Sequence, residues 1–453
     1  MKNLWLRLSA LLLVVVFLAG CTPGAGNKTS INGIGIDRFT IVYSETAPDY
    51  CQRAAEYIQA QILARTGKEI PVCTAQSGTY EHEILVGDTD RALSQGLKSK
   101  NQKMEFYFKA DDKHVAMNAD YFIIAAAAYY FVETYIPGEK FRSEIPTDCI
   151  TVAQPITQTP TNYIFLIGDG MGPNHIQMFD YLSLPEVPYY DGEMIFYGEY
   201  FPYQGVVHTY SFSGVTDSAA AATALATGCK TINSHVGRDA DGNDLQSLTE
   251  LAISKGMATA VMSTDLMTGA TPAGFSAHAD DRDDSKTILE CQTKLMTENG
   301  TKIVCGLHAT EEYQTDIAET LEALDQSENG FFLMYEEGHI DKFSHNNDIE
   351  ETFACVIRFN QAIGLFMEYA FYHPDTFVII TADHETGGLL PDEDGQMQYN
   401  SESHTGTDVP VFAYGAGAEV FKDFDDENTQ IPKNIAAMWG VANFGEFRVS
   451  PLE

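Results

Sequence analysis

Four short segments that are almost continuously apolar most constrain the fold of this chain. They lie at Tyr163–Ile167, Ala258–Met262, Phe331–Tyr335 and Thr376–Thr381, and helical patterns separate them. Strands with an unbroken apolar sequence are typical of a parallel sheet, because helices cover both of its faces. From Asn162 onward, the sequence therefore predicts an α/β fold with a mainly parallel sheet sandwiched by helices.

The N-terminal segment has the pattern of an export signal. Basic residues precede an apolar run over Leu8–Leu18 that is too short for a typical membrane-spanning helix. The following Leu18-Ala19-Gly20-Cys21 resembles a bacterial lipobox. We predict a signal peptide over residues 1–20, a lipid on Cys21 and a flexible tether over 21–33. The protein would then be exported and lipid-anchored to the bacterial cell membrane, on its periplasmic or cell-surface side. The alternative is an uncleaved N-terminal anchor.

Residues 34–154 predict a separate, small α/β domain. Strand-like segments alternate there with helical patterns at Tyr50–Arg65 and Tyr121–Thr134. This pattern resembles the accessory domain that precedes the barrel in some glycoside hydrolases. We interpret it as a spacer or an interaction domain that contacts glycans or proteins. A linker rich in Pro, Thr and Gln, residues 155–161, joins it to the predicted catalytic domain, residues 162–453.

The chain is strongly acidic, with 64 Asp and Glu against 27 Lys and Arg and a net charge of −37. This excess of negative charge argues against nucleic acid as a partner. An anionic substrate would have to be attracted locally, by metal ions or by an arginine.

Polar residues follow directly on three of the four apolar segments. Asp169 follows the first, Glu336 the third, and Asp383 and His384 the fourth. Ligands bind at the carboxyl ends of the strands in open α/β sheets. We therefore expect these side chains to meet at one edge of the sheet.

Two further residues extend this set with the spacing of metal ligands. Asp341 and His345 are four residues apart, so a helical turn would place them on the same face. His404 adds an imidazole from a predicted loop. Mixed histidine and carboxylate ligands suit Zn²⁺, whereas ligand sets made only of oxygen suit Mg²⁺.

Ser218 opens a helical pattern over Ala219–Thr227 that Gly228 closes. A serine at a helix N-terminus lies among unpaired backbone N–H groups, which stabilise both an alkoxide and a phosphate. Taken alone, Asp217 and Ser218 could be ordinary N-cap residues, the carboxylates could be turn or solvated residues, and His404 could be a surface histidine. Their joint occurrence favours a two-metal phosphoryl-transfer site.

The order of these motifs over Asn162–Gly415 resembles that of the alkaline phosphatase family. The resemblance implies a hydrolase of small phosphate monoesters in which Ser218 is the nucleophile and forms a phosphoserine. It also implies that Arg282 grips the phosphate oxygens and that Asp217 orients Arg282. The implied cofactors are two Zn²⁺ and one Mg²⁺. Their ligands would be Asp341, His345 and His404 for one zinc, Asp169, Asp383 and His384 for the other, and Asp169, Thr271 and Glu336 for magnesium.

Two positions depart from the family pattern. Gly269 stands two residues before Thr271, where relatives commonly carry Asp or His. Either water then completes the magnesium shell, or the site is weak or differently occupied. Gly269→Asp should strengthen Mg²⁺ binding. The alternative is that Gly269 forms a turn that needs positive φ. Lys342 lacks the acidic partner that some relatives supply, so we expect it to reach toward the phosphate as a substrate-binding residue.

Two other functions stay open at this point. A phosphodiesterase or sulfatase of the same superfamily usually has Thr or a modified Cys as its nucleophile. A non-catalytic surface binding lipoprotein would use its first domain to hold glycans. The combination of Ser218, Arg282, Thr271 and Glu336 favours the phosphomonoesterase. The natural substrate and the oligomeric state cannot be read from these residues.

Overall fold

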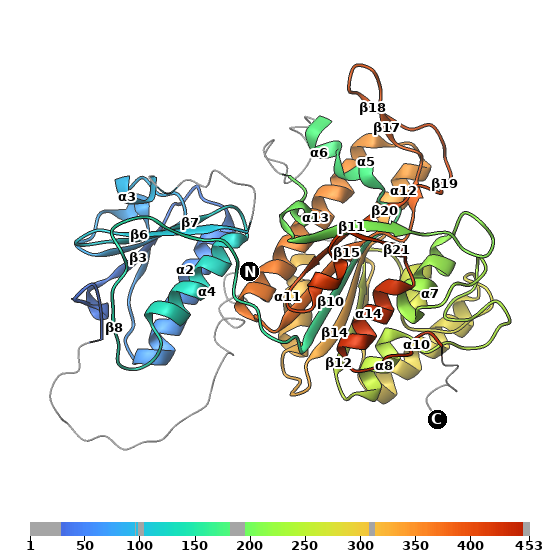
Figure 1. Cartoon of the computed structure of the whole chain (residues 1–453), viewed down its shortest axis with the longest axis horizontal. Coiled ribbons are helices and arrows are strands. Elements are labelled where there is room, and N and C mark those ends of the chain that lie inside the picture. The colour runs from blue at the N-terminus through green and yellow to red at the C-terminus, as the bar shows by residue number, and fades with distance from the viewer. Residues whose placement is uncertain (1–28, 96, 98–103, 182–194, 308–312, 447–453) are drawn as a thin grey trace. The chain divides into compact units, whose positions relative to one another are not determined.

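The computed structural model describes residues 29–95, 97, 104–181, 195–307 and 313–446. Contacts between residues divide the chain into two compact units (Figure 1). The first comprises residues up to 156 together with 367–374, and the second comprises 157–366 and 375 onward. The expected signal peptide and Cys21 lie outside the described residues and stay predictions.

The first unit is built on a six-stranded mixed sheet of strand order β4-β3-β5-β7-β6-β9. The first four of these strands run parallel, and β6 is antiparallel to both of its neighbours. The strands are β3 (Thr40–Tyr43), β4 (Val72–Thr74), β5 (Glu83–Val86), β6 (Phe106–Ala110), β7 (Val115–Ala119) and β9 (Ile150–Val152). Helices α2 (Asp49–Thr66) and α4 (Ile123–Tyr135) pack together on one face (Figure 1), and α3 (Ala92–Gln95) contacts β7. Both long helices coincide closely with the helical patterns in the sequence.

A small sheet at the start of this unit corrects one expectation. It consists of β1 (Ser30–Ile31), β2 (Ile34–Gly35) and β8 (Arg142–Ser143), and the 3₁₀ helix η1 (Ile36–Arg38) follows β2. Ile31 is fully buried, and the Ser30 N–H donates to the Phe141 carbonyl (3.1 Å). The prediction of a flexible tether through residue 33 is therefore wrong for residues 29–33, because an apolar side chain and backbone hydrogen bonds hold this segment in the sheet.

The second unit is built on an eight-stranded sheet of order β13-β12-β14-β10-β15-β20-β11-β21. The first five strands run parallel, β20 is antiparallel to both of its neighbours, and β21 is parallel to β11. The strands are β10 (Asn162–Gly168), β11 (Tyr203–His208), β12 (Ala258–Ser263), β13 (Lys302–Cys305), β14 (Phe331–Glu337), β15 (Thr376–Thr381), β20 (Val409–Tyr414) and β21 (Phe424–Glu427). The four apolar segments of the sequence are its central strands β12, β14, β10 and β15.

Helices cover both faces of this sheet (Figure 1). They are α7 (Ser218–Thr227), α8 (Leu248–Ser254), α10 (Ser285–Asn299), α11 (Tyr313–Leu324), α13 (Ile349–Tyr372) and α14 (Gln430–Met438). In β14, Tyr335 stacks on Phe359 of α13 with a centroid distance of 6.4 Å, whereas Phe332 meets Trp439, just after α14, at 5.8 Å. The two faces of the strand thus pack against different helices, which explains its continuously apolar sequence. A mainly parallel sheet with helices on both faces confirms the predicted fold class.

Short elements surround the carboxyl ends of the central strands. They are α5 (Pro173–Ile176), α6 (Met178–Tyr181), α9 (Ala270–Gly274), α12 (His339–His345), β16 (Glu385–Thr386), β17 (Leu390–Pro391), β18 (Met397–Gln398) and β19 (His404–Thr405). Elsewhere, η3 (Tyr197–Tyr200) precedes β11, and η5 (Ala418–Phe421) follows β20. Among the residues that the structure describes, no helix combines the length and apolar character needed to cross a membrane.

Candidate metal centre and active site

The carboxyl ends of three central strands place acidic side chains at one edge of the sheet. Asp169 follows β10 directly, Glu336 is the second-last residue of β14, and Asp383 follows β15 by two residues. Their charges are close enough that Asp383 and Glu336 both raise the pKa of Asp169. The strand-end argument therefore predicts which side chains meet here, although Asp169 and Asp383 are 214 residues apart along the chain.

The first of two groups with the geometry of a metal site consists of Asp341, His345 and His404. The two imidazole Nε2 atoms lie 3.1 Å apart, and each lies 3.4 Å from Asp341 Oδ1. His345 Nδ1 contacts the Glu402 carbonyl (2.5 Å), and His404 Nδ1 contacts the Thr216 carbonyl (2.9 Å). A carbonyl only accepts hydrogen bonds, so each Nδ1 donates and each Nε2 keeps a lone pair for a cation.

The second group consists of Asp169, Asp383 and His384. His384 Nε2 lies 3.3 Å from Asp383 Oδ2 and 3.6 Å from Asp169 Oδ1. The other Asp383 oxygen accepts the backbone N–H groups of Gly170 (3.1 Å) and His384 (2.9 Å). Asp383 Oδ2 and Asp169 Oδ1 are buried and accept no hydrogen bond from any described residue. Leaving a buried carboxylate oxygen without a partner is costly, so both oxygens fit the role of cation ligands.

Burial and mutual repulsion shape the electrostatics of these two groups. Burial raises the pKa of Asp169 well above its usual range, and the charges of Asp383 and Asp341 raise it further. Burial also favours neutral Asp341, but its contact with His404 and the charge that His384, His404 and His345 carry when protonated outweigh burial and lower the pKa of Asp341. Three carboxylates gathered in a buried cluster call for compensating positive charge, which divalent cations would provide.

The third predicted ligand set combines Asp169 with Thr271 of α9 and Glu336 of β14. Burial raises the pKa of Glu336 to about 8, although the nearby hydroxyls of Ser263 and Thr271 oppose this rise. Thr271 is 1% exposed, and its hydroxyl forms no well-aligned hydrogen bond with a described residue. Its oxygen is therefore available to a cation, as is Asp169 Oδ1, whereas one Glu336 oxygen accepts a hydrogen bond from the Ser263 hydroxyl. All-oxygen coordination of this kind suits Mg²⁺.

Ser218 is the first residue of α7, and Asp217 is its N-cap. The Asp217 Oδ1 accepts the Ala220 N–H (2.9 Å), and Gly228 ends the helix in the left-handed conformation (φ 74°). Ser218 is 4% exposed, and its Oγ lies 3.2 Å from His384 Nε2 of the second group. The hydroxyl thus combines a helix N-terminus with direct contact to a candidate metal ligand.

Arg282 lies beside Ser218 through its contact with Asp217. Its Nη1 is 3.3 Å from Asp217 Oδ2, which also accepts the Ser234 N–H (2.9 Å). The Arg282 N–H in turn donates to the Ser234 carbonyl (2.9 Å). The guanidinium is 34% exposed, so it is oriented by Asp217 and still offers donors to an anion at Ser218.

Lys342 differs from its expected environment. Its ammonium forms an ion pair with Asp265 Oδ1, so the expectation that it lacks an acidic partner is wrong. Asp265 was missed because it matches no motif, although it follows β12 as the other acidic residues follow their strands. Thr386 was also missed. Its hydroxyl donates to Asp341 Oδ1, and no local pattern marks this contact.

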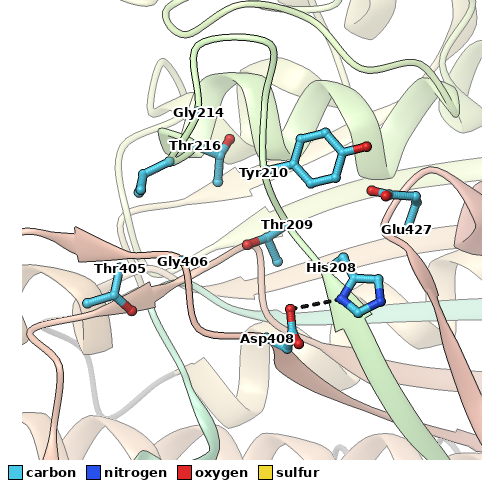
Figure 2. Close-up of a pocket in the computed structure, with 10 residues that line it drawn as sticks. His208, Thr209, Tyr210, Gly214, Thr216, Thr405, Gly406, Asp408 and Glu427 are labelled. Carbon is cyan, nitrogen blue, oxygen red and sulfur yellow. Dashed lines mark hydrogen bonds and ion pairs between the residues drawn. The ribbon is translucent and has the colours of Figure 1, made fainter.

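A pocket of about 320 Å³ is lined by residues around the end of β11, before α7 and after β19 (Figure 2). Thr216, whose carbonyl contacts His404, and Thr405, the residue after His404, both line it. His208 and Asp408 form an ion pair in its wall (2.9 Å). The other lining residues include Tyr210, Gly214, Val215, Gly406 and Glu427. The pocket therefore adjoins the first group through Thr216 and Thr405.

Comparison with known proteins identifies the family of this chain. A sequence model described as alkaline phosphatase matches residues 160–307 and 309–399, which together are more than half of the chain. The chain belongs to the alkaline phosphatase family. This confirms the family expected from the motifs. The resemblance of the first unit to glycoside hydrolase accessory domains stays a prediction.

Several members of the alkaline phosphatase family are similar to this chain. Alkaline phosphatase 3 of Bacillus subtilis is 30% identical over 306 residues, which cover 53% of this chain and 64% of that protein. Alkaline phosphatase 4 of the same organism is 28% identical over 307 residues, covering 53% of this chain and 65% of that protein. The matches thus span just under two thirds of these two relatives.

A solved structure shows the same fold. The alkaline phosphatase from the Antarctic bacterium TAB5 is 25% identical to this chain, with a TM-score of 0.53, and the match covers 64% of this chain and 99% of that one. A mutant of that protein has been solved with Mg bound in its M3 site.

Proposed function

We propose that this chain is a metal-dependent hydrolase of phosphate monoesters that acts through a phosphoserine on Ser218. The position of the Ser218 hydroxyl carries this proposal. It is buried at the N-terminus of α7 and lies 3.2 Å from His384 Nε2. A nucleophile at this point would meet the phosphorus of an ester whose oxygens face the helix N–H groups and Arg282.

Hydrolysis would proceed by two successive displacements at phosphorus. In the first, Ser218 Oγ bonds to phosphorus as the ester P–O bond breaks, and the alcohol leaves with a proton. In the second, a water oxygen bonds to phosphorus as the Oγ–P bond breaks, which regenerates the serine and releases inorganic phosphate. Asp217 orients the Arg282 guanidinium. The guanidinium would donate hydrogen bonds to two phosphoryl oxygens and neutralise their charge in both steps.

The proposed cofactors are two Zn²⁺ and one Mg²⁺. Asp341, His345 and His404 would hold one zinc, Asp169, Asp383 and His384 the other, and Asp169, Thr271 and Glu336 the magnesium. When bound, such cations neutralise the charge on attacking and leaving oxygens and favour ionisation of a hydroxyl. The buried Asp169 and Asp383 oxygens that lack a hydrogen bond support this assignment.

A comparison of three chromogenic esters tests the proposed activity. Zinc-loaded protein should hydrolyse p-nitrophenyl phosphate much faster than bis(p-nitrophenyl) phosphate or p-nitrophenyl sulfate. A preference for the diester would favour the phosphodiesterase of the same superfamily. Hydrolysis of none of the three would favour a non-catalytic binding protein.

Arg282→Ala should impair monoester hydrolysis more than diester hydrolysis. A hydrogen-bonded pair with a charged group contributes about 1.5–3 kcal/mol, so we expect kcat/KM for the monoester to fall roughly 10- to 150-fold. A diester has one fewer charged oxygen and should lose less. Arg238→Ala is a matched control, because Arg238 pairs with Asp244 and Asp280 in a neighbouring loop. Equal losses for both esters would show that Arg282 does not contact the transferred group.

We also propose export and lipid anchoring through Cys21, which the export-signal pattern and the lipobox-like sequence support. Cells that make the chain should incorporate labelled palmitate into it and retain it in the membrane fraction, because acyl chains partition into the bilayer. Cys21→Ser should abolish the label. A label that persists in the variant, or is absent from the parent, would contradict lipidation at this residue.

A further inference from the structure

The loop between β12 and α9 carries a carboxylate, Asp265, to which neither the motifs nor the family resemblance gives a role. Its backbone is held from both sides: the Asp265 N–H donates to Ser263 Oγ (2.8 Å), and the Gly306 N–H donates to the Asp265 carbonyl (2.6 Å). The side chain is 22% exposed. Its position is therefore set by the sheet edge that also carries Glu336.

Asp265 occupies the space into which a side chain at position 269 would project. A Cβ on Gly269 would lie 2.7 Å from Asp265 Oδ2 and 2.9 Å from the Leu266 carbonyl oxygen, closer than real Cβ atoms approach such groups. Gly269 itself has φ −58° and ψ 156°, which any residue can adopt. The interpretation of Gly269 as a positive-φ turn is therefore wrong. Glycine is required here because the Asp265 carboxylate and the loop backbone fill the site.

The Asp265 side chain borders the third ligand set. A Cβ on Gly338 would lie 3.1 Å from Asp265 Cβ and 3.5 Å from Glu336 Oε1, so the two acidic side chains lie against the same glycine. The second Asp265 oxygen, Oδ1, pairs with Lys342, the residue next to Asp341. The buried Thr271 hydroxyl supplies an oxygen that no described residue satisfies with a well-aligned hydrogen bond. This is independent evidence that a ligand belongs at the site.

We propose that Asp265 is the additional carboxylate of the magnesium site, in place of the side chain that Gly269 lacks, and that Lys342 balances its charge. This rests on the proposed function for the identity of the cation. Mg²⁺ dehydrates reluctantly and keeps several waters, so a fixed anion beside the ligand set binds it by orienting those waters. Relatives commonly carry Asp or His two residues before the threonine, and here a carboxylate six residues before it takes that place.

The test measures Mg²⁺ binding directly, by calorimetric titration of the zinc-loaded full chain with MgCl₂. Asp265→Asn keeps the size of the side chain and still accepts a hydrogen bond from Lys342, but it removes the charge. Loss of a partner outside the ligand shell typically costs ~10–100-fold in metal affinity, so we expect the Kd for Mg²⁺ to rise by about that factor. Asp394→Asn removes the same charge from an exposed position after β17 and should leave the Kd within about twofold of the parent value.

Lys342→Met distinguishes two roles for Asp265: a carboxylate that supports Mg²⁺ binding, or a partner in a structural ion pair only. Both substitutions remove the ion pair between Asp265 and Lys342. Only Lys342→Met leaves the Asp265 charge in place and removes a competing cation. Lys342→Met should therefore bind Mg²⁺ at least as tightly as the parent. Parent-like affinity in Asp265→Asn, or equal weakening in both variants, would overturn the proposal, as would failure of the parent to bind Mg²⁺.

For Gly269→Asp, the structure predicts the opposite change in Mg²⁺ affinity from the one that the sequence predicts. The introduced side chain would have to displace Asp265 and shift the Leu266 carbonyl, so it should not strengthen Mg²⁺ binding. Stronger binding in this variant would contradict our account of the loop. None of these titrations involves an ester, so a failure of the proposed hydrolysis and a failure of the Asp265 assignment would be seen separately.

Discussion

Ser218→Ala should reduce kcat for p-nitrophenyl phosphate by about 10⁴-fold or more, the scale of loss seen when a covalent nucleophile is removed. The hydroxyl oxygen would form the bond to phosphorus. It contacts Nε2 of His384, whereas the Thr386 hydroxyl contacts Nδ1 of the same ring. Alanine is well tolerated at the start of a helix that is already rich in alanine, so folding should be unaffected. Zinc content should also stay at the parent level, because the proposed metal ligands are other residues.

Acid-quench labelling and a control variant distinguish loss of the nucleophile from disruption of the whole active site. Labelled phosphate should be trapped on the parent by acid quench and be absent from Ser218→Ala. Thr223→Ala is a control in the same helix, because the Thr223 hydroxyl is fully buried and contacts the His235 carbonyl. Labelling of the alanine variant at the parent level would refute the assignment of Ser218.

His404→Ala should lower bound zinc by about one ion per chain and reduce kcat/KM by roughly 10³-fold. The side chain is one of the three candidate ligands of the first group, and its Nε2 faces Asp341 at 3.4 Å. Loss of a cation removes several kcal/mol of transition-state stabilisation. Chelation of the parent should have a similar effect, and Zn²⁺ should reverse it.

The matched control is His208→Ala in the neighbouring pocket. His208 pairs with Asp408 and Asp425 and belongs to neither candidate metal group. Elemental analysis should therefore find unchanged zinc in this variant. Unchanged zinc and rate in His404→Ala would show that the first group does not hold the cation.

The central sheet was predictable because its signal is local. A strand buried on both faces has an unbroken apolar sequence, and four such segments became β10, β12, β14 and β15. The acidic residues that follow these strands were predictable for the same reason, since parallel strands end at one edge. The helix after Ser218 was equally clear, because Asp217 and Gly228 are typical residues for its two ends.

Other features depend on contacts that leave no local trace. Residues 29–33 look like a polar tether, yet Ile31 is buried in a strand that pairs with residues more than a hundred positions later. The Lys342 environment was mispredicted for a similar reason. Its partner Asp265 is distant in sequence, and the side chains of long charged residues are directed by their partners.

By itself, the sequence determined the α/β class, the family and most of the residues that meet at the sheet edge, because periodicity and motif order are properties of the linear chain. Only the tertiary structure decided which nitrogen of His345 and His404 faces Asp341, since backbone carbonyls from other loops orient both rings. It also decided why residue 269 is glycine. Space that a neighbouring side chain already fills is a property of packing in three dimensions, and no local pattern of residues records it.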